Sequence, residues 1–519
     1  MLRIEGSKFR VSKLLFRFFF GNKSIVYSFI ILQKNYHLIM KYDTGTFHRS
    51  LNLFDSTAIV MGSMIGSAIF IVSADISRNV GGAGWLLLVW VITGMMTVFA
   101  ALSYGELAGM MPKAGGIYVY LREAYSPLFG FLYGWTLFLV VQCGTIAAVA
   151  MAFSKFLGVL LPWISEDNLF FQLNHLTVNF TQLVAILSIL FLTWINSKGV
   201  EEGKKIQNVF TYSKILILIL LIGLGFLFSK GFASSDLWHG SQVPQGVHLP
   251  TGVFALVVGI GISMVGSLFA SDAWYNITFT SSEVINPKRN IPLSLFLGTL
   301  IVCVLYFLVN LIYIKILPAV GNPNGLSVAD QGIQFASEDR VATAAMKQIL
   351  GRSAEIVVAI VLLVSTFGCN NGIILSGARV YYAMARDKLF FNKAGQLNQK
   401  GVPSAGLWVQ AIWSTILCLS GTYSQMLDYV IFAALIFNIL TIFAVFVLRY
   451  RKPDIERPYK TIGYPLIPAV YIVLCVFIEI ILLRYKPLFT WPGLIIVLTG
   501  VPAYYFWKYH RKILGKLYR

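Results

Sequence analysis

The sequence has 519 residues, of which 57% are hydrophobic and only 12% are charged, and its mean hydropathy is +0.74. Its apolar residues fall in runs too long for the core elements of a soluble domain, so the composition excludes a soluble globular protein and indicates a polytopic membrane protein. These runs do not alternate in polarity, which excludes a β-barrel and leaves helices as the spanning elements.

The first 39 residues lie before the expected membrane domain. Their apolar stretch is broken by Arg17, Lys23 and Lys34 into pieces too short to span, and it lacks a small-residue cleavage site. We therefore expect residues 1–39 to be a non-core extension. They are either an interfacial segment or the result of a misread start, with translation beginning at Met40.

About twelve apolar segments of spanning length follow along the chain. A helix needs about 20 mostly apolar residues to cross the hydrocarbon core of a bilayer. The segment 318–352 is expected to form an amphipathic hairpin on the outer face, and 511–519 a cytoplasmic tail. The expected spanning helices lie near 51–76, 84–110, 127–161, 176–196, 205–229, 251–282, 291–317, 353–385, 404–421, 425–449, 464–484 and 489–508.

Lys and Arg are distributed unevenly among the connections between these segments. The stretch from Phe156 to Thr193, which joins the third and fourth helices, contains neither residue type, whereas the connections after even-numbered helices are basic. Because basic loops stay in the cytoplasm, we expect a cell-membrane protein with both termini cytoplasmic. The net charge of +19 lies in these loops and in the tails, where it attracts the headgroups of the lipid bilayer, so no nucleic acid partner is required.

The cysteines and histidines give no sign of a metal site. All five cysteines fall in apolar segments without metal-ligand spacing, which predicts free thiols. His175, His239 and His248 lie in outer loops, also without such spacing. We expect no metal ion and no cofactor.

Two of the apolar segments are interrupted near their middle. In "VMGSMIGSAIF" the glycines Gly62 and Gly66 lie at mid-span, which indicates either close helix packing or a bend of the backbone. In the segment 251–282, Asp272 lies near mid-span, where an ionisable side chain costs at least about 2.5 kcal/mol. Such a residue must face a cavity or a partner.

Interrupted helices at corresponding places in two halves are typical of a transporter built from an inverted repeat. A break around Gly66 would expose N–H groups suited to a carboxylate, at the start of the outer half of the helix. A break between Phe269 and Asp272 would expose C=O groups suited to an ammonium. We expect a zwitterion between them.

Longer motifs at and beyond these residues resemble the L-type amino acid transporter family of the amino acid–polyamine–organocation superfamily. The resemblance covers about residues 50–510, and we expect a bacterial member. The motifs are "GSMIGSAIF" (62–70), "MPKAGGIYVYLREAYSP" (111–127), "LFASDAWYN" (268–276), "SSEVINPKRNIP" (281–292) and "ARVYYAMARDKLF" (378–390).

The resemblance implies an all-α membrane protein of 12 transmembrane helices with the LeuT-like fold. Its permease domain would span 40–510, with broken helices 1 and 6. Helices 1–5 and 6–10 would form inverted repeats at about 51–229 and 251–449, and helices 11 and 12 would follow at about 464–508.

The resemblance also implies a substrate site at the two breaks. The carboxylate of an amino acid would bind backbone N–H groups of 66–68, and its ammonium would bind the carbonyls of Met64, Phe269 and Asp272. Phe269 would be an aromatic gate and Trp274 a wall of the pocket. At Ala68 the family more often has glycine, so this site is narrower. The full expected set is Met64, Ile65, Gly66, Ser67, Ala68, Phe269, Ser271, Asp272 and Trp274.

Lys214, in "TYSKILIL" on the fifth helix, has two alternative roles. The lysine could snorkel to the cytoplasmic interface, since it lies about 14 Å of helical rise beyond the basic pair at 204–205. The resemblance implies instead that its ammonium replaces a sodium ion and links helix 1 near Gly62 to helix 8 at Ser365 and Thr366.

Four further charged residues are expected away from the substrate. Glu106 would be a solvated or paired helix end, whereas Glu283, Arg379 and Arg386 would make cytoplasmic gate contacts or headgroup contacts. Asp272 itself could be the N-cap of the inner half of helix 6, or a charged side chain that interacts with the substrate or with a proton.

The leading hypothesis is a sodium-independent exchanger of neutral amino acids that works by alternating access. A proton-coupled symporter is the alternative, because of Asp272. From another class, a membrane enzyme or a non-transporting sensor is disfavoured, since no catalytic constellation and no soluble signalling domain are evident.

Animal members of the family often pair with a single-span partner through a cysteine between helices 3 and 4. The loop 162–175 has no cysteine, so no disulfide-linked heavy subunit is expected.

Overall fold

The computed structural model describes residues 47–173, 176–229, 231–233, 237–238, 253–420 and 423–517. The extension 1–39, Met40 and the three outer-loop histidines, His175, His239 and His248, lie outside these residues.

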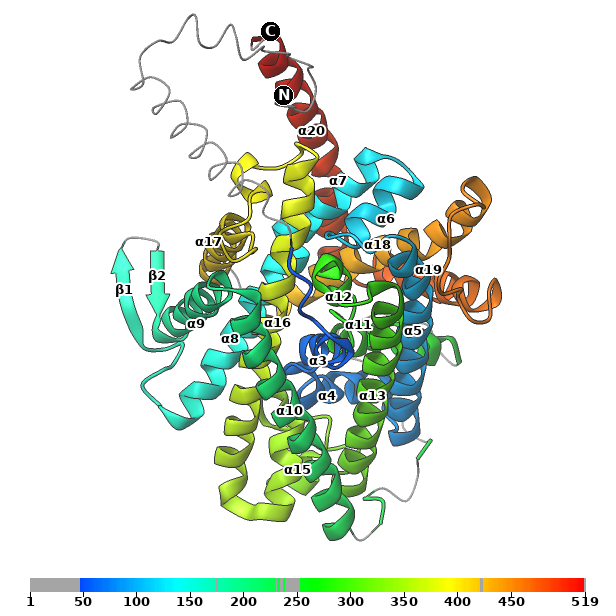
Figure 1. Cartoon of the computed structure of the whole chain (residues 1–519). Helices are drawn as coiled ribbons and strands as arrows, with labels where there is room; N and C mark the ends of the chain where they lie inside the picture. The colour runs from blue at the N-terminus through cyan, green and yellow to red at the C-terminus, as the bar shows by residue number, and fades with distance from the viewer. Residues whose placement is uncertain are drawn as a thin grey trace, which may run out of the picture. The chain divides into compact units, whose positions relative to one another are not determined.

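Helices form nearly all of the regular structure in this part of the chain (Figure 1). In the first half they are α3 (Leu53–Met64), η1 (Ala68–Phe70), α4 (Ser73–Val80), α5 (Ala83–Met110), α6 (Ile117–Ala124), α7 (Pro127–Thr136), η2 (Leu137–Val141), α8 (Gln142–Leu160), α9 (Phe180–Ser197) and α10 (Val200–Phe228). In the second half they are α11 (Val253–Ala270), α12 (Asn276–Phe279), η3 (Ser281–Glu283), α13 (Pro287–Ile316), α14 (Val328–Gln331), η4 (Ser337–Asp339), α15 (Val341–Leu350), η5 (Gly351–Ser353), α16 (Ala354–Arg386), η6 (Asn392–Gly395), α17 (Ser404–Ser420), α18 (Tyr423–Arg451), α19 (Leu466–Tyr485) and α20 (Pro487–Leu517).

Eight of the described helical spans are long and apolar enough to cross a membrane. Three further apolar helices, α3, α11 and α17, are shorter. The protein is therefore a multi-pass membrane protein of helical type, as the composition predicts. The eight spans are α5, the continuous Pro127–Leu160, α9, α10, α13, α16, Val430–Arg451 of α18, and α19.

A small β-hairpin departs from the expected all-α fold. Strands β1 (Leu169–Leu173) and β2 (Leu176–Asn179) pair antiparallel in the connection before α9. Aromatic and β-branched residues in "LFFQL" and "LTVN" favour strands, but the pattern is too short to be separated from an apolar loop in the sequence. At Asn179 the chain enters α9 through a capping box with Gln182.

The first predicted interruption separates α3 from α4. Helix α3 begins with a capping box between Asn52 and Asp55 and ends at Met64, and α4 begins only at Ser73, with η1 between them. The second interruption separates α11, which ends at Ala270, from α12. It starts slightly later than the sequence suggests, since Phe269 is still helical.

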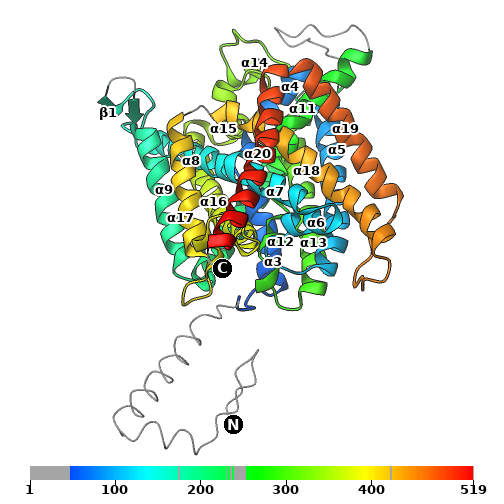
Figure 2. The ribbon, with the colours of Figure 1, turned by 90° about the horizontal axis from the view of Figure 1, so that it is seen from above.

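The first break lies at the centre of the helix bundle. Helix α3 packs against α10, α13 and α16, and Figure 1 shows it between them. Figures 1 and 2 both show α5 and α13 side by side on one flank, and α9 and α17 on the opposite flank. Any ligand held at this break is therefore enclosed by helices from both halves of the chain.

The basic connections meet at one end of the bundle, which we call the basic end. Arg122 pairs with Asp387, Lys288 Nζ lies 2.6 Å from Glu456, and Lys452 Nζ lies 3.0 Å from Glu123. Burial alone would raise the pKa of Glu123, but hydrogen bonds from Lys452 and Arg122 hold this pKa below its ordinary value. Ion pairs thus connect segments at this end of the bundle that are far apart in the sequence.

Candidate functional site

A small cavity lies between the two helix breaks. It brings together most of the residues predicted for the substrate, from both broken helices, with additional walls from α8 and α16. Its lining consists of Ser63, Met64, Gly66, Ser67, Ala68, Thr145, Val149, Phe269, Ala270, Asp272, Ala273, Cys369 and Ile373.

Three predicted residues do not line this cavity. The Ile65 side chain is fully buried, and this residue contributes its carbonyl to the lysine contact described below. Ser271 and Trp274 line a second cavity instead, together with residues of α5, α18 and α19. The Trp274 ring packs edge-on against Tyr104, with 4.7 Å between ring centroids. Asp272 lines both cavities and so lies in the wall between them.

The first break leaves backbone N–H groups without a backbone acceptor among the described residues. Ile65 still donates to Met61 at 2.9 Å, as the last residue held by α3. In the described part of the chain, the N–H groups of Gly66 and Ala68 donate to no acceptor. Such groups at a helix break are suited to an anionic oxygen.

Tyr306 of α13 connects the two breaks, although no pattern in the sequence singled it out. Its hydroxyl lies 3.1 Å from the carbonyl oxygen of Met64 and 3.2 Å from that of Ala270. The carbonyl of Phe269 accepts from the N–H of Asp272 at 3.2 Å. Two of the three carbonyls predicted for an ammonium, those of Met64 and Phe269, therefore already have a donor.

The N-cap hypothesis for Asp272 is wrong. The N-cap of α12 is Tyr275, without a side-chain cap hydrogen bond, because the unwound stretch is longer than the sequence suggested. The carboxylate of Asp272 instead accepts from the Tyr275 hydroxyl at 3.2 Å. Ala273 completes the break with a φ of 63°, which is uncommon for a residue with a Cβ.

Lys214 binds the end of α3. Its side chain is 1% exposed, and its Nζ donates to the carbonyl oxygens of Gly62 and Ile65, both at 2.7 Å. The snorkelling alternative is therefore wrong, because the ammonium points into the bundle. A buried ammonium requires such acceptors, and the carbonyls at a helix end require donors.

Helix α16 reaches the same carbonyls from the other side. The Ser365 hydroxyl lies 3.0 Å from the Gly66 carbonyl oxygen and 3.3 Å from that of Ile65, which Lys214 also binds. The Cys369 thiol contacts the Ser63 carbonyl at 3.1 Å. Thr366, by contrast, donates within its own helix, to Leu362 at 2.7 Å. The predicted link between Lys214 and the eighth expected span, which is α16 in the structure, thus runs through the Ile65 carbonyl, to which both Lys214 and Ser365 donate.

Glycines allow these helices to approach closely. A Cβ added at Gly62 would lie 2.1 Å from both Gln207 Nε2 and Thr211 Oγ1 of α10. A Cβ added at Gly368 of α16 would lie 2.4 Å from Phe210 Cβ and 3.0 Å from Lys214 Cε. Close packing therefore explains Gly62, and its carbonyl still accepts from Lys214. The small-residue spacing of Gly368 and Gly372 on α16 could have pointed to this contact.

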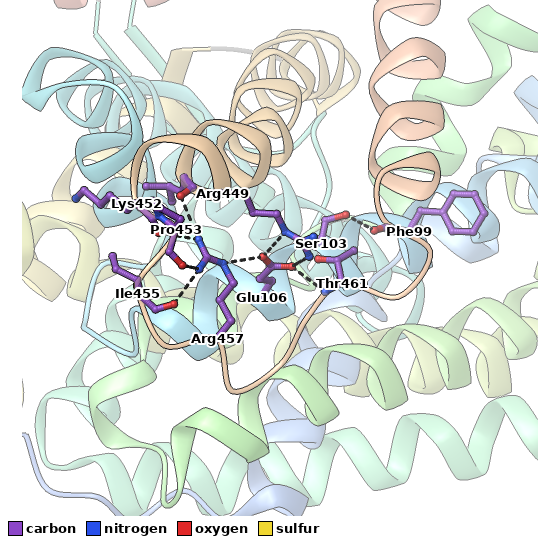
Figure 3. Close-up of polar contacts among 10 residues, drawn as sticks. Phe99, Ser103, Glu106, Arg449, Lys452, Pro453, Ile455, Arg457 and Thr461 are labelled. Atoms are coloured by element: carbon purple, nitrogen blue, oxygen red, sulfur yellow. Dashed lines mark hydrogen bonds and ion pairs between the residues drawn. The ribbon is translucent and has the colours of Figure 1, made fainter.

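Two buried carboxylates are matched with arginines nearer the basic end. Glu283 and Arg379 form a bidentate pair at 2.9 and 3.2 Å, with both side chains 1% exposed. Glu106 accepts from Arg449 at 2.7 and 2.9 Å and from the Thr461 N–H at 2.7 Å, as Figure 3 shows. Glu106 is thus a paired helix end, and Glu283 and Arg379 hold each other.

Comparisons with known proteins identify the family of this chain. The amino acid permease family model matches residues 51–503. The human large neutral amino acids transporter small subunit 2 is 29% identical over 473 residues, which are 89% of this chain and 82% of the relative. The mouse b(0,+)-type amino acid transporter 1 is 27% identical, with 90% of each chain covered. The mouse Asc-type amino acid transporter 1 is 28% identical over 89% of this chain and 82% of the relative.

The family match extends from just before α3 to the middle of α20, and so includes both helix breaks, Lys214 and the α16 contacts. The chain therefore belongs to the amino acid permease family of the amino acid–polyamine–organocation superfamily, with L-type amino acid transporters among its relatives.

Proposed function

We propose that this protein is a sodium-independent transporter of neutral amino acids, and that it works as an exchanger by alternating access. The observation that carries the proposal is the Lys214 ammonium, 2.7 Å from the carbonyl oxygens of Gly62 and Ile65 at the first break. A fixed cation at these helix-end carbonyls serves the electrostatic role of a bound sodium ion, so that no sodium is required.

The substrate would lie in the cavity between the two breaks. Its carboxylate would bind the N–H groups of Gly66, Ser67 and Ala68, and its ammonium would be held by the carbonyl or carboxylate of Asp272. Thr145, Val149, Cys369 and Ile373 line the cavity with uncharged side chains, which supports a neutral side chain in the substrate. The cavity is small, and the Ala68 methyl favours small substrates.

The proposal includes the complete architecture. Ten of the twelve spans would form inverted repeats at 51–229 and 251–449, and the last two would lie within 464–508. The protein would lie in the cell membrane with its basic end facing the cytoplasm.

One relative is named as a small subunit. The loop 162–175 of this chain has no cysteine, so we expect no disulfide-linked partner there. A membrane enzyme or a sensor is disfavoured by the transporter relatives.

A proton-coupled symporter is the second candidate. The observation that favours it is Asp272, whose carboxylate lines both small cavities and accepts a hydrogen bond from the Tyr275 hydroxyl. Ionisable groups inside a membrane often serve as proton relays.

Uptake into liposomes that contain the purified full chain tests these functions. Liposomes preloaded with an unlabelled neutral amino acid should take up labelled amino acid much faster than empty liposomes, equally in sodium and choline. Uptake by empty liposomes that needs an inward proton gradient would support symport instead. Uptake that depends on sodium, or no uptake from a full panel of amino acids, would contradict the proposed function.

A further inference from the structure

Glu479 of α19 differs from the other buried carboxylates of the protein. Among the described residues, four acidic side chains are buried, namely Asp55, Glu106, Glu283 and Glu479. Glu106 and Glu283 bind arginines, and Asp55 binds Asn208 at 2.7 Å and Lys204 at 3.5 Å. Both oxygens of Glu479 are buried without a hydrogen-bond partner in the described part of the chain.

The position of Glu479 makes its isolation unusual. The side chain is 8% exposed and lies in a helix that is apolar enough to span the membrane. It is on the buried face of α19, which packs against α5, α11, α18 and α20, so it does not point into lipid. Two residues further along α19, Ile481 forms an apolar cluster with Val258 and Ile262 of α11, against which Tyr485 packs. A charged carboxylate in these surroundings has nothing to replace its hydration.

Among the side chains that the structure describes, the neighbouring helices place no cation against Glu479. Helix α11 contains no titratable residue, and α5 contains only Tyr104, which donates to Asn438, and Glu106, which is paired. On α19 itself, Arg484 is exposed and lies 6.0 Å from the Tyr485 ring centroid. The remaining titratable side chains described on α18 and α20 are Arg449, Tyr450, Arg451, Tyr504, Tyr505, Lys508 and Tyr509, all on the last turns of α18 or in the second half of α20.

A polar stripe leads from Glu479 to the second cavity. Tyr471, Cys475 and Glu479 are spaced four residues apart and so share one face of α19, and all three are buried. Tyr471 lines the cavity that Asp272 also lines. In the other direction, Glu479 lies six residues before the last residue of the helix, or about 9 Å of rise from its end.

We propose that Glu479 is a proton-binding site, at which one proton from water beyond the end of α19 binds the carboxylate and is released again. Neutralisation by a proton is what an unpartnered carboxylate in an apolar site requires. The polar stripe of Tyr471, Cys475 and Glu479 reaches the second cavity, which Asp272 also lines. A change in the charge of Glu479 would therefore influence the second helix break. Transport would then depend on pH even where amino acid exchange itself moves no proton. This coupling rests on the proposed function, whereas proton binding does not.

Infrared spectroscopy of the full chain in liposomes tests proton binding directly. The wild-type protein should show a band from a protonated carboxyl without a hydrogen bond, which diminishes as the pH is raised. Glu479→Gln should lose this band, because glutamine has no carboxyl group. Glu456→Gln, at an exposed acidic residue, is the matched control and should keep it. If Glu479→Gln does not fold, Glu479→Asp keeps a titratable group there and should show a shifted band.

Two results would overturn the proposal: no protonated-carboxyl band at any pH in the wild-type protein, or an unchanged band in a folded Glu479→Gln protein. Uptake measurements separate this failure from that of the proposed function. If the infrared bands behave as expected but no amino acid is taken up, the proposed transport function is contradicted and the proton-binding site is not. Uptake with an identical pH profile in wild type and Glu479→Gln would overturn the coupling.

Discussion

At the residue scale, three side chains hold the unwound part of the first broken helix. Lys214, Ser365 and Tyr306 come from three different helices, and each donates to carbonyl groups that α3 no longer satisfies. Each unpaired buried carbonyl would cost about 1–3 kcal/mol, so together these donors make a break at this depth stable. They also make its position sensitive to small changes in those helices.

Tyr306→Phe should reduce amino acid uptake about tenfold in a folded protein. The substitution removes the hydroxyl shared by Met64 and Ala270, and a loss near 1.4 kcal/mol corresponds to a factor of ten. Tyr313→Phe is the matched control on the same helix, because the Tyr313 hydroxyl is buried without a partner in the described chain. Equal uptake by the two variants would show that the Tyr306 bridge has no role in transport.

At the element scale, the close contact of α3 with α10 and α16 decides where Lys214 can reach. The contact depends on glycines, since a Cβ at Gly62 would overlap Gln207 and Thr211. The ammonium then meets the end of α3 at hydrogen-bond distance. A wider separation of α3 and α10 would leave this contact unmade.

Gly62→Ala should lower the free energy of unfolding by about 1–3 kcal/mol, because the added methyl overpacks the contact with α10. Gly223→Ala in α10 is the control, since a Cβ there meets no atom within 4 Å. That control should be neutral or slightly stabilising, as alanine favours helix. Denaturant unfolding in detergent measures both, and a Gly62→Ala protein as stable as the control would refute the packing role.

The sequence predicted that long apolar segments form helices and that two of them are interrupted, because long apolar runs and mid-span Gly or Asp residues are strong signals. It did not predict Tyr306, since a single tyrosine in an apolar helix has no periodic signature. It placed Trp274 against the substrate, whereas the longer unwound stretch with Ala273 at positive φ turns this ring towards Tyr104. It left Glu479 unnoticed, because burial without a partner is visible only in three dimensions.

At the scale of the whole molecule, charge pairs at and near the basic end join segments that are far apart in the sequence. Glu283 and Arg379 connect the segment before α13 to α16, and Glu106 connects α5 to α18 and to the loop before α19. Alternating access requires such contacts to form in one state and to break in another.

Arg379→Met should destabilise the protein by about 3–5 kcal/mol, because it leaves Glu283 buried without its partner. Replacing both residues with methionine should restore much of that stability. Lys288→Met, at an exposed pair with Glu456, should cost less than about 1 kcal/mol. Thermal unfolding of the four proteins in detergent tests this, and equal losses in Arg379→Met and Lys288→Met would contradict a buried gate.

The most direct test of the central claim is exchange by wild-type and Lys214→Ala proteins in preloaded liposomes, each measured in sodium and in choline. If the Lys214 ammonium replaces a sodium ion, wild-type uptake is the same in both salts, and Lys214→Ala is strongly impaired although folded. Lys205→Ala, on the exposed part of the same helix, should exchange normally. Wild-type uptake that collapses in choline, or a Lys214→Ala protein with unaltered rate and affinity, would contradict the account.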